Sequence, residues 1–369
     1  MSLLGAERVR TMSHPSKLPE MPFWTAGRKQ TLLDMLGPLN TDGTSNVAIP
    51  RVRVEWNRVA KANTSYAIKG PISPFKIPST YREPEEEKAA VAIVDGDTNA
   101  CADLAMRWFF LGDSAAAAKA VSILTAWSSI TVWDNSSGAT TPLVWASRMT
   151  RLIQASFLLR NYSGYTTAVH NAFRALILRG IDGGASPTSG YTNNVGAWGV
   201  AYDIACAKFL NDRPLLLRSL NTWRRYFDIN VVGNVPIHEI HRQGGIINGD
   251  GSTGLWYSNF LVYALAVGAE WARFSGEWLY DHEGPDGSTF KELALLVRYW
   301  TRNPALFPYN TSGTPSETVR SLPHDEILHA LWPNADSEWI LANFPNGSDR
   351  DSHGVRGSVL IYRGRPLYG

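Results

Sequence analysis

The sequence lacks the features that mark several large classes of protein. It contains only two cysteines, Cys101 and Cys206, in apolar stretches without metal-ligand spacing, so two buried free thiols are expected rather than a disulfide. No apolar run reaches the length of a membrane-spanning helix. The N-terminal residues also lack the apolar core of a secretory signal. We therefore expect a protein that is cytoplasmic, released by another route, or trimmed of its signal, with no membrane partner.

Charge of either sign is not in excess. Lys and Arg number 35 and Asp and Glu 33, which leaves a formal net charge of +2 and no general field for a polyanion. Nucleic acid is therefore not expected as the main partner. No repeat of fixed period is visible, which argues against TPR-like or HEAT-like arrays. The residue that is abundant is tryptophan, with 14 copies. A flat indole face suits the C–H face of a pyranose, although helix packing is expected to account for at least half of them.

The first part of the chain, residues 1–84, is predicted to be an irregular arm. Nine prolines interrupt any long helix there, and only Gln30–Leu36 has room for a turn or two. Such an arm would wrap the surface or attach the protein to a larger assembly. Residues 85–369 are predicted to form the main domain.

From residue 85 to about residue 344 the hydrophobic pattern is that of α-helices. A break in the first predicted helix is considered near Asp95–Asp97. The final segment, Ser358–Ile361, is predicted to be a short strand or a docked tail. The predicted helices are Ala89–Leu111, Ala115–Ser129, Leu143–Arg160, Tyr165–Arg179, Asn194–Leu210, Pro214–Phe227, Leu255–Ser275, Thr289–Arg302, Asp325–Trp332 and Ser337–Phe344.

Short turns between consecutive helices predict antiparallel helical hairpins. Several such hairpins in a row form a bundle, a solenoid or an α/α toroid. The toroid fits best, because its inner helices are apolar all round while the loops at one end build a cleft. The predicted fold class is therefore all-α, an incomplete (α/α) toroid.

One stretch, Val235–Tyr280, combines a polar, glycine-rich loop with a long apolar helix. Trp256 and Tyr257 lie at the junction of the two parts. A polar loop that leads into a buried helix is suited to hold reactive side chains at the mouth of a pocket. The groups in the loop that exchange protons or bind anions are His238, Glu239, His241, Arg242, Gln243 and Asp250.

Three segments resemble, in the same order, helices of the alginate-lyase-type polysaccharide lyases. GLWYSNFLVYALAVGAEWARFSGEWLY is similar to the family helix that starts with an aromatic-Tyr-Ser motif, and TNNVGAWGVAYDIACAKFLND to its Asn-Asn-His-x-x-Trp helix. LAMRWFFLGDSAAAAKAVSILTAW resembles an earlier helix pair joined by a Gly-Asp turn. The resemblance covers about residues 85–300. It implies an α/α toroid and an enzyme that cleaves a uronic-acid glycan, an acidic polysaccharide, by β-elimination.

The chemistry of such a lyase explains which residue types it needs. The proton on C5 is very weakly acidic while the neighbouring carboxylate keeps its charge, so donors must neutralise that carboxylate and a base and an acid must move protons. The resemblance implies that Asn194 and Arg242 neutralise the carboxylate and that Tyr257 serves as base and acid. The family's histidine is replaced by Val195, which cannot exchange a proton. His241 is therefore included as a further catalytic candidate.

Other residues are predicted to contact substrate or support those that do. Asn193 is either such a contact or a helix cap, and Trp198 is either core or a subsite wall. Glu239 is expected to orient Arg242. The remaining predicted substrate contacts are His238, Gln243 and Trp256.

The sequence gives no metal site and no cofactor. His238 and His241 have the spacing of neighbours on a helix, but no third ligand follows at a recognisable distance. Neither is therefore predicted to hold a metal ion.

Two other classes of function stay open. A glycoside hydrolase on the same fold would take a carboxylate pair from Glu239, Asp250 and Glu270. A non-catalytic glycan-binding tail protein would fit the lost histidine. The absent signal and the proline-rich arm also fit an extracellular or virion-associated depolymerase, held on a particle by its first 80 or so residues.

Overall fold

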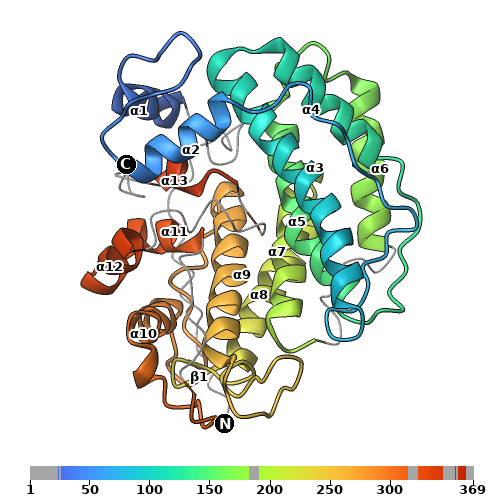
Figure 1. The fold of residues 1–369 in the computed structure, drawn as a ribbon. Helices are drawn as coiled ribbons and strands as arrows, with labels where there is room; N and C mark the ends of the chain where they lie inside the picture. The colour runs from blue at the N-terminus through green and yellow to red at the C-terminus, as the bar shows by residue number, and fades with distance from the viewer. Residues whose placement is uncertain are drawn as a thin grey trace, which may run out of the picture.

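The computed structural model describes residues 24, 26–182, 191–314, 323–343, 354 and 356–362. Within these ranges the chain is almost entirely helical, and the described β-structure consists of one two-stranded antiparallel sheet and isolated bridges. Eight helices form four successive hairpins, as predicted from the pattern (Figure 1). They are α3 (Pro84–Leu111) and α4 (Ser114–Trp127), α5 (Thr140–Leu158) and α6 (Thr167–Asp182), α7 (Asn194–Leu210) and α8 (Arg213–Asn230), and α9 (Gly254–Phe274) and α10 (Phe290–Arg302).

The first helix of each hairpin lies on the inside of a curved double layer. Helices α3, α5, α7 and α9 pack side by side in that order, and α4, α6, α8 and α10 cover them from outside. Three inner helices are buried on every side: 17 of the 19 residues of α5, 14 of the 17 of α7 and 18 of the 21 of α9 are buried, whereas α3, at the edge of the layer, buries 10 of 28. This all-round burial confirms the predicted toroid. No helix in the described part of the chain is long and apolar enough to span a bilayer.

The direction of the inner helices determines where a site can form. Because each inner helix is followed by an antiparallel outer one, α3, α5, α7 and α9 all begin at the same end of the molecule. Their N-termini carry unpaired N–H groups and the positive end of the helix dipole, which favour anionic groups nearby. The polar loop before α9 lies at this end.

The prediction of an irregular N-terminal arm is wrong where two helices form, whereas residues 37–49 and 61–83 contain no helix. The predicted turn or two at Gln30–Leu36 lies within the first of these helices. Helix α1 (Ala26–Leu36) precedes a second helix, α2 (Pro50–Ala60), which begins at a proline because the first turn needs no N–H from that residue. Val52, Trp56 and Val59 of α2 are buried in the same hydrophobic core as the toroid. The predicted attachment to a particle through the first 80 or so residues stays a prediction, and residues 1–23 of that segment lie outside the described residues.

The segment between α2 and α3 is tied to the toroid by one buried carboxylate. Asp97 on α3 accepts hydrogen bonds from the Tyr66 hydroxyl (2.9 Å), the Lys69 N–H (3.0 Å), the Gly70 N–H (2.9 Å) and the Trp127 indole N–H (2.8 Å). The first three bonds fix the path of the segment along α3, and the fourth ties α4 to the same carboxylate. Helix α3 continues through Asp95–Asp97, where a break was considered.

The C-terminal residues close the inner wall of the toroid. After α11 (His324–Leu331) and α12 (Ala335–Asn343) comes α13 (Ser358–Tyr362), a short helix, so the docked tail is confirmed and the strand is wrong. Arg356 donates to Asp103 on α3 at 3.1 and 3.3 Å, and the Tyr362 hydroxyl donates to Glu270 on α9. The tail thus connects the first inner helix to the last.

Packing accounts for most of the tryptophans and for both cysteines. Cys101 and Cys206 are buried free thiols, as predicted. The buried tryptophans are Trp24, Trp56, Trp127, Trp145, Trp198, Trp223, Trp271 and Trp300.

Candidate active site

The start of α7 places two asparagines in different roles. Asn193 precedes the helix and its side-chain oxygen accepts a hydrogen bond from the Val195 N–H at 3.1 Å, so it caps the helix, and its contact with substrate stays a prediction. Asn194 is the first residue of the helix and is 1 % exposed. A side chain at Gly196 would collide with the Tyr226 hydroxyl from α8. This close approach explains the glycine in the first turn of α7.

Glu239 is a fully buried carboxylate that holds Asn194. It follows the β1 (Val231–Val232) and β2 (Val235–Pro236) hairpin and accepts from the Asn194 backbone N–H at 2.5 Å. The Asn194 side-chain amide donates to both Glu239 oxygens, at 3.1 and 3.2 Å. Burial raises the pKa of Glu239 to about 7, against the opposing effects of the Arg242 charge and the Asn194 bonds. Glu239 was expected to orient Arg242, but its hydrogen-bonded partner is Asn194.

Arg242 lies between Glu239 and the first turn of α9. Its Nε–H donates to the Gly244 carbonyl at 3.3 Å. Its guanidinium carbon lies 4.1 Å from the centroid of the Tyr257 ring, in a cation–π contact. The side chain is 6 % exposed. The positive charge therefore faces both the buried carboxylate and the phenol.

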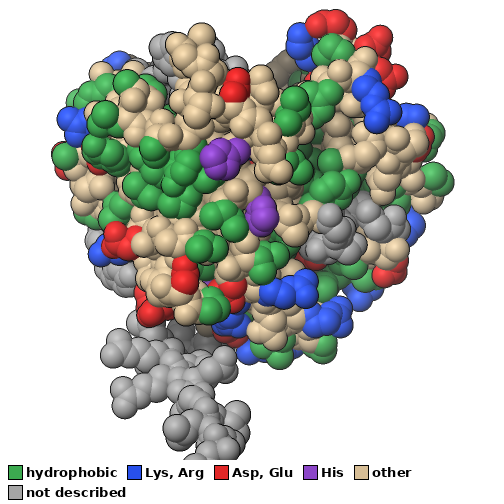
Figure 2. Space-filling view, turned by 90° about the horizontal axis from the view of Figure 1, so that it is seen from below, with side chains coloured by type: hydrophobic (Ala, Val, Ile, Leu, Met, Phe, Trp, Pro, Cys, Tyr) green, Lys and Arg blue, Asp and Glu red, His purple; other side chains and the backbone are tan. Residues whose placement is uncertain are grey.

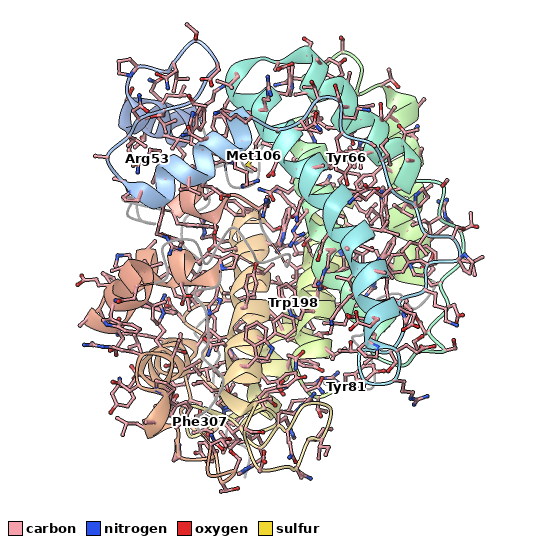
Figure 3. The ribbon with its side chains drawn as sticks, viewed as in Figure 1. Arg53, Tyr66, Tyr81, Met106, Trp198 and Phe307 are labelled. Carbon is pink, nitrogen blue, oxygen red and sulfur yellow. The ribbon has the colours of Figure 1, made fainter. Side chains whose placement is uncertain are left out.

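Tyr257 bonds to a tyrosine from a distant part of the chain. Its hydroxyl oxygen is 2.7 Å from that of Tyr81, which precedes α3 (Figure 3). Burial, and then the Tyr81 hydroxyl, raise the pKa of Tyr257 above its ordinary value, and Arg242 only partly offsets them. Arg242 was expected to lower this pKa; it acts in that direction, but burial outweighs it.

Tyr81 was not found from the sequence. It is 59 % exposed, and its ring lies against the backbone of Gly245 in the loop before α9. It sits between two prolines in a segment predicted to be irregular, where no periodicity marks a functional side chain. Tyr81 and Tyr257 are 176 residues apart in the sequence, and only the folded structure brings their hydroxyls together.

Two pairs of contacts therefore join the start of α7 and the start of α9 to the polar loop. Asn194 hydrogen-bonds to Glu239, and Arg242 lies over the ring of Tyr257, whose hydroxyl meets that of Tyr81. The two pairs are linked by charge, since Arg242 lowers the pKa of Glu239 against the effect of burial. The structure thus brings together the amide, the guanidinium and the phenol that the sequence singled out. Figure 2 shows the end of the molecule where these helices begin, and at its centre histidine, hydrophobic and other uncharged groups predominate.

The two tryptophans of the predicted site differ in accessibility. Trp198 is fully buried, edge-on to Tyr263 with ring centroids 5.0 Å apart, so it belongs to the core and is not a subsite wall (Figure 3). Trp256 is half-buried and stacks on Phe260, with centroids 6.2 Å apart and an interplanar angle of 9°. Only Trp256 has a surface that a sugar could contact without rearrangement.

The remaining polar residues of the loop stand apart from the phenol. His238 is half-buried, and His241 is exposed with its ring edge-on to Tyr309 at 5.5 Å. Gln243 is exposed, and its backbone pairs with that of Ile246. None of the three side chains hydrogen-bonds to Asn194, Arg242 or Tyr257 in the described structure.

The carboxylates of the hydrolase alternative do not face one another. Asp250 accepts from the Ser252 N–H at 2.9 Å, which is turn chemistry. Glu270 lies about 24 Å along α9 from its first residue, fully buried and bonded to Arg273 and Tyr280. It is therefore distant from Glu239. Within the described ranges, no group of three His, Cys, Asp or Glu side chains gathers as a metal site.

Comparison with known proteins gives one family and several related folds. The model of the alginate lyase family matches residues 55–307. No curated protein sequence matches.

Three solved structures illustrate the related fold. An alginate lyase from Bacteroides ovatus has 15 % identity and a TM-score of 0.67, over 94 % of this chain and 99 % of that one. Alginate lyase A1-III from Sphingomonas species A1 has 17 % identity and a TM-score of 0.67, over 96 % and 100 %. A tyrosine-to-phenylalanine variant of alginate lyase A1-III, complexed with a tetrasaccharide, has 17 % identity and a TM-score of 0.70, over 96 % and 99 %.

Proposed function

The chain belongs to the alginate lyase family and is a polysaccharide lyase, and we propose that it cleaves a uronic-acid glycan by β-elimination at Tyr257, Arg242 and Asn194. The observation that carries this proposal is the cation–π contact of Arg242 with Tyr257, close enough to Glu239 for its charge to act on the carboxyl that holds Asn194. It supports a site with two donors and one proton-transfer group at the common end of the inner helices, where helix dipoles also favour an anionic substrate.

The donors act on the substrate carboxylate. Removal of the C5 proton makes an enolate-like anion, which is stabilised by hydrogen bonds that are already in place. Arg242 supplies a charged planar donor. The Asn194 amide has two N–H groups, and one is sufficient for the bond to Glu239, so the other is available for the substrate.

Tyr257 moves both protons in this scheme. Because its pKa is raised, the phenol is protonated at neutral pH and can give its proton to the departing glycosidic oxygen on C4. In the same concerted step its oxygen takes the proton that leaves C5, so enolate-like charge develops beside the carboxylate as the C4–O bond breaks. The C5–H and C4–O bonds break, a C4=C5 double bond forms, and the phenol ends the cycle protonated. Val195 lies where the family has histidine and supplies no second base.

Tyr81 and Trp256 are the proposed aromatic contacts at the mouth of the site, since both present accessible ring surface. His241 remains the alternative base.

An extracellular or virion-associated place of action is part of the proposal, because an acidic polysaccharide too large to enter a cell is met outside it.

The test is a screen of uronic-acid polysaccharides for the absorbance of an unsaturated product. Tyr257→Phe and Arg242→Ala should each lower the rate by about 10²-fold or more, and the control Tyr299→Phe, at an exposed tyrosine on α10, should leave it unchanged. A His241→Ala variant that keeps its activity assigns both proton transfers to Tyr257. New reducing ends without absorbance would instead indicate hydrolysis, and binding without turnover would indicate a glycan-binding protein.

A further inference from the structure

The loop that joins Arg242 to α9 is held in one conformation by hydrogen bonds. Gln243 and Ile246 exchange two backbone bonds of 3.0 Å across a tight turn, in which Gly244 has a φ of +55°. The Gly244 N–H donates to the Thr253 hydroxyl at 2.8 Å, and the Gly249 N–H to the His241 carbonyl at 2.7 Å. We call residues 243–249 the isoleucine loop. Its rigidity fixes where its side chains point.

Two consecutive apolar side chains at the tip of this loop are exposed. Ile246 is 58 % exposed and Ile247 48 %. Turn residues are usually polar or small, and aliphatic side chains left in water add nothing to the stability of the fold. Two of them together on a rigid turn therefore point to an apolar group that binds there.

The position of the loop connects it to the reacting groups. Its Gly244 carbonyl accepts from Arg242, and its Gly245 backbone lies under the ring of Tyr81. The hydroxyl of the same Tyr81 is 2.7 Å from that of Tyr257. Gly245, the residue before the two isoleucines, is thus separated from the phenol by one tyrosine ring, and that tyrosine is 59 % exposed.

We propose that Ile246 and Ile247 form an apolar subsite for acyl groups on the substrate, so that the enzyme favours a uronan whose ring hydroxyls carry acetyl esters. This inference rests on the proposed function. Carboxylates and free hydroxyls gain nothing from aliphatic side chains, and flat sugar faces are better matched by the rings of Trp256 and Tyr81. A neutral ester with a terminal methyl group is the substituent that two branched aliphatic side chains complement.

The experiment compares one uronan in two forms. The polymer with the highest rate in the screen above is assayed after chemical O-acetylation with acetic anhydride and after alkaline deacetylation. For each acetyl methyl group that the subsite buries, the kcat/KM of the wild-type enzyme should be about fourfold higher on the acetylated form than on the deacetylated form. Replacing both residues, Ile246→Ser with Ile247→Ser, should remove this preference and leave the rate on the deacetylated form unchanged. The control Leu217→Ser, at a leucine on α8 that is 46 % exposed, should keep the preference.

Each contrary outcome has a distinct meaning. Equal wild-type rates on both forms, or a preference that survives the double substitution, overturns the acyl subsite and leaves the lyase intact. The wild-type protein could also be a dimer that becomes a monomer on double substitution, while the preference for the acetylated polymer is unchanged. That result overturns the acyl subsite and shows instead that the isoleucines form a contact between two copies of the chain. No product from either form overturns the proposed function, and this inference with it.

Discussion

The titration of Glu239 should make the stability of this protein depend on pH in an identifiable way. The pKa of the folded carboxyl, about 7, is above its ordinary value of 4.5. Between these two values the folded protein keeps a proton that the unfolded chain has released, so stability falls as the pH rises from about 4.5 to about 7 and is level beyond. At about 1.4 kcal/mol per pH unit, the loss amounts to about 3 kcal/mol.

Glu239→Gln isolates this contribution. The amide keeps an acceptor oxygen for the Asn194 N–H and has no proton to release. Urea unfolding, followed by circular dichroism at pH 5 and pH 8, gives the difference in unfolding free energy between variant and wild type at each pH. That difference should move by about 3 kcal/mol in favour of the variant between pH 5 and pH 8. Titrations of other groups are common to both proteins and cancel.

Glu270→Gln is the matched control. Glu270 is also fully buried, but its pKa is lowered, because the bonds and charge from Arg273, Tyr280 and Tyr362 outweigh burial. Its contribution to stability is present above pH 4.5 and is lost only as the pH falls through the lowered pKa. The control should therefore be destabilised equally at pH 5 and pH 8. Parallel pH dependences of the Glu239→Gln variant and the wild type would refute the reasoning.

Two further predictions follow from single contacts. Tyr81→Phe removes a hydroxyl that raises the pKa of Tyr257, so the alkaline fall in activity should begin at lower pH in a pH–rate profile; an unmoved alkaline limb would contradict this. Gly196→Ala places a methyl group against the Tyr226 hydroxyl and should cost about 1–3 kcal/mol in urea unfolding. Tyr226→Phe in the same chain should restore only part of that loss, because the ring carbon Cζ and the Tyr191 carbonyl would also lie within 2.5 Å of the added carbon. A Gly196→Ala protein as stable as the wild type would contradict the collision.

Much of the helical architecture could be predicted because local signals and burial agree. Helix α7 has the predicted bounds, since an asparagine caps its start and Asn211, with a φ of +55°, ends it. Helix α2 was missed because Pro50 reads as a helix breaker unless its position in the first turn is known. The final segment, with Val359 and Ile361, has the composition of a strand, but docking against the toroid makes it a helix.

The candidate site was only partly predictable. The resemblance singled out Asn194, Arg242 and Tyr257; Arg242 lies over the ring of Tyr257, and its charge acts on the carboxyl that holds Asn194. The sequence did not show that Glu239 would hold Asn194, because the two are 45 residues apart and no pattern links them. Tyr81 reaches the site only through the path of the segment that Asp97 anchors. Side chains that meet through tertiary structure alone leave no periodic signal.

The docking of the C-terminal tail has a consequence for how the protein is made. Tyr362 bonds to Glu270 and Arg356 to Asp103, so the innermost wall is complete only when residues 356–362 have been synthesised. During translation the earlier hairpins form while that wall is open. Removal of residues 356–362 would take one partner from each of two buried carboxylates, and truncation within this segment should therefore be tolerated far less well than a change in a surface loop.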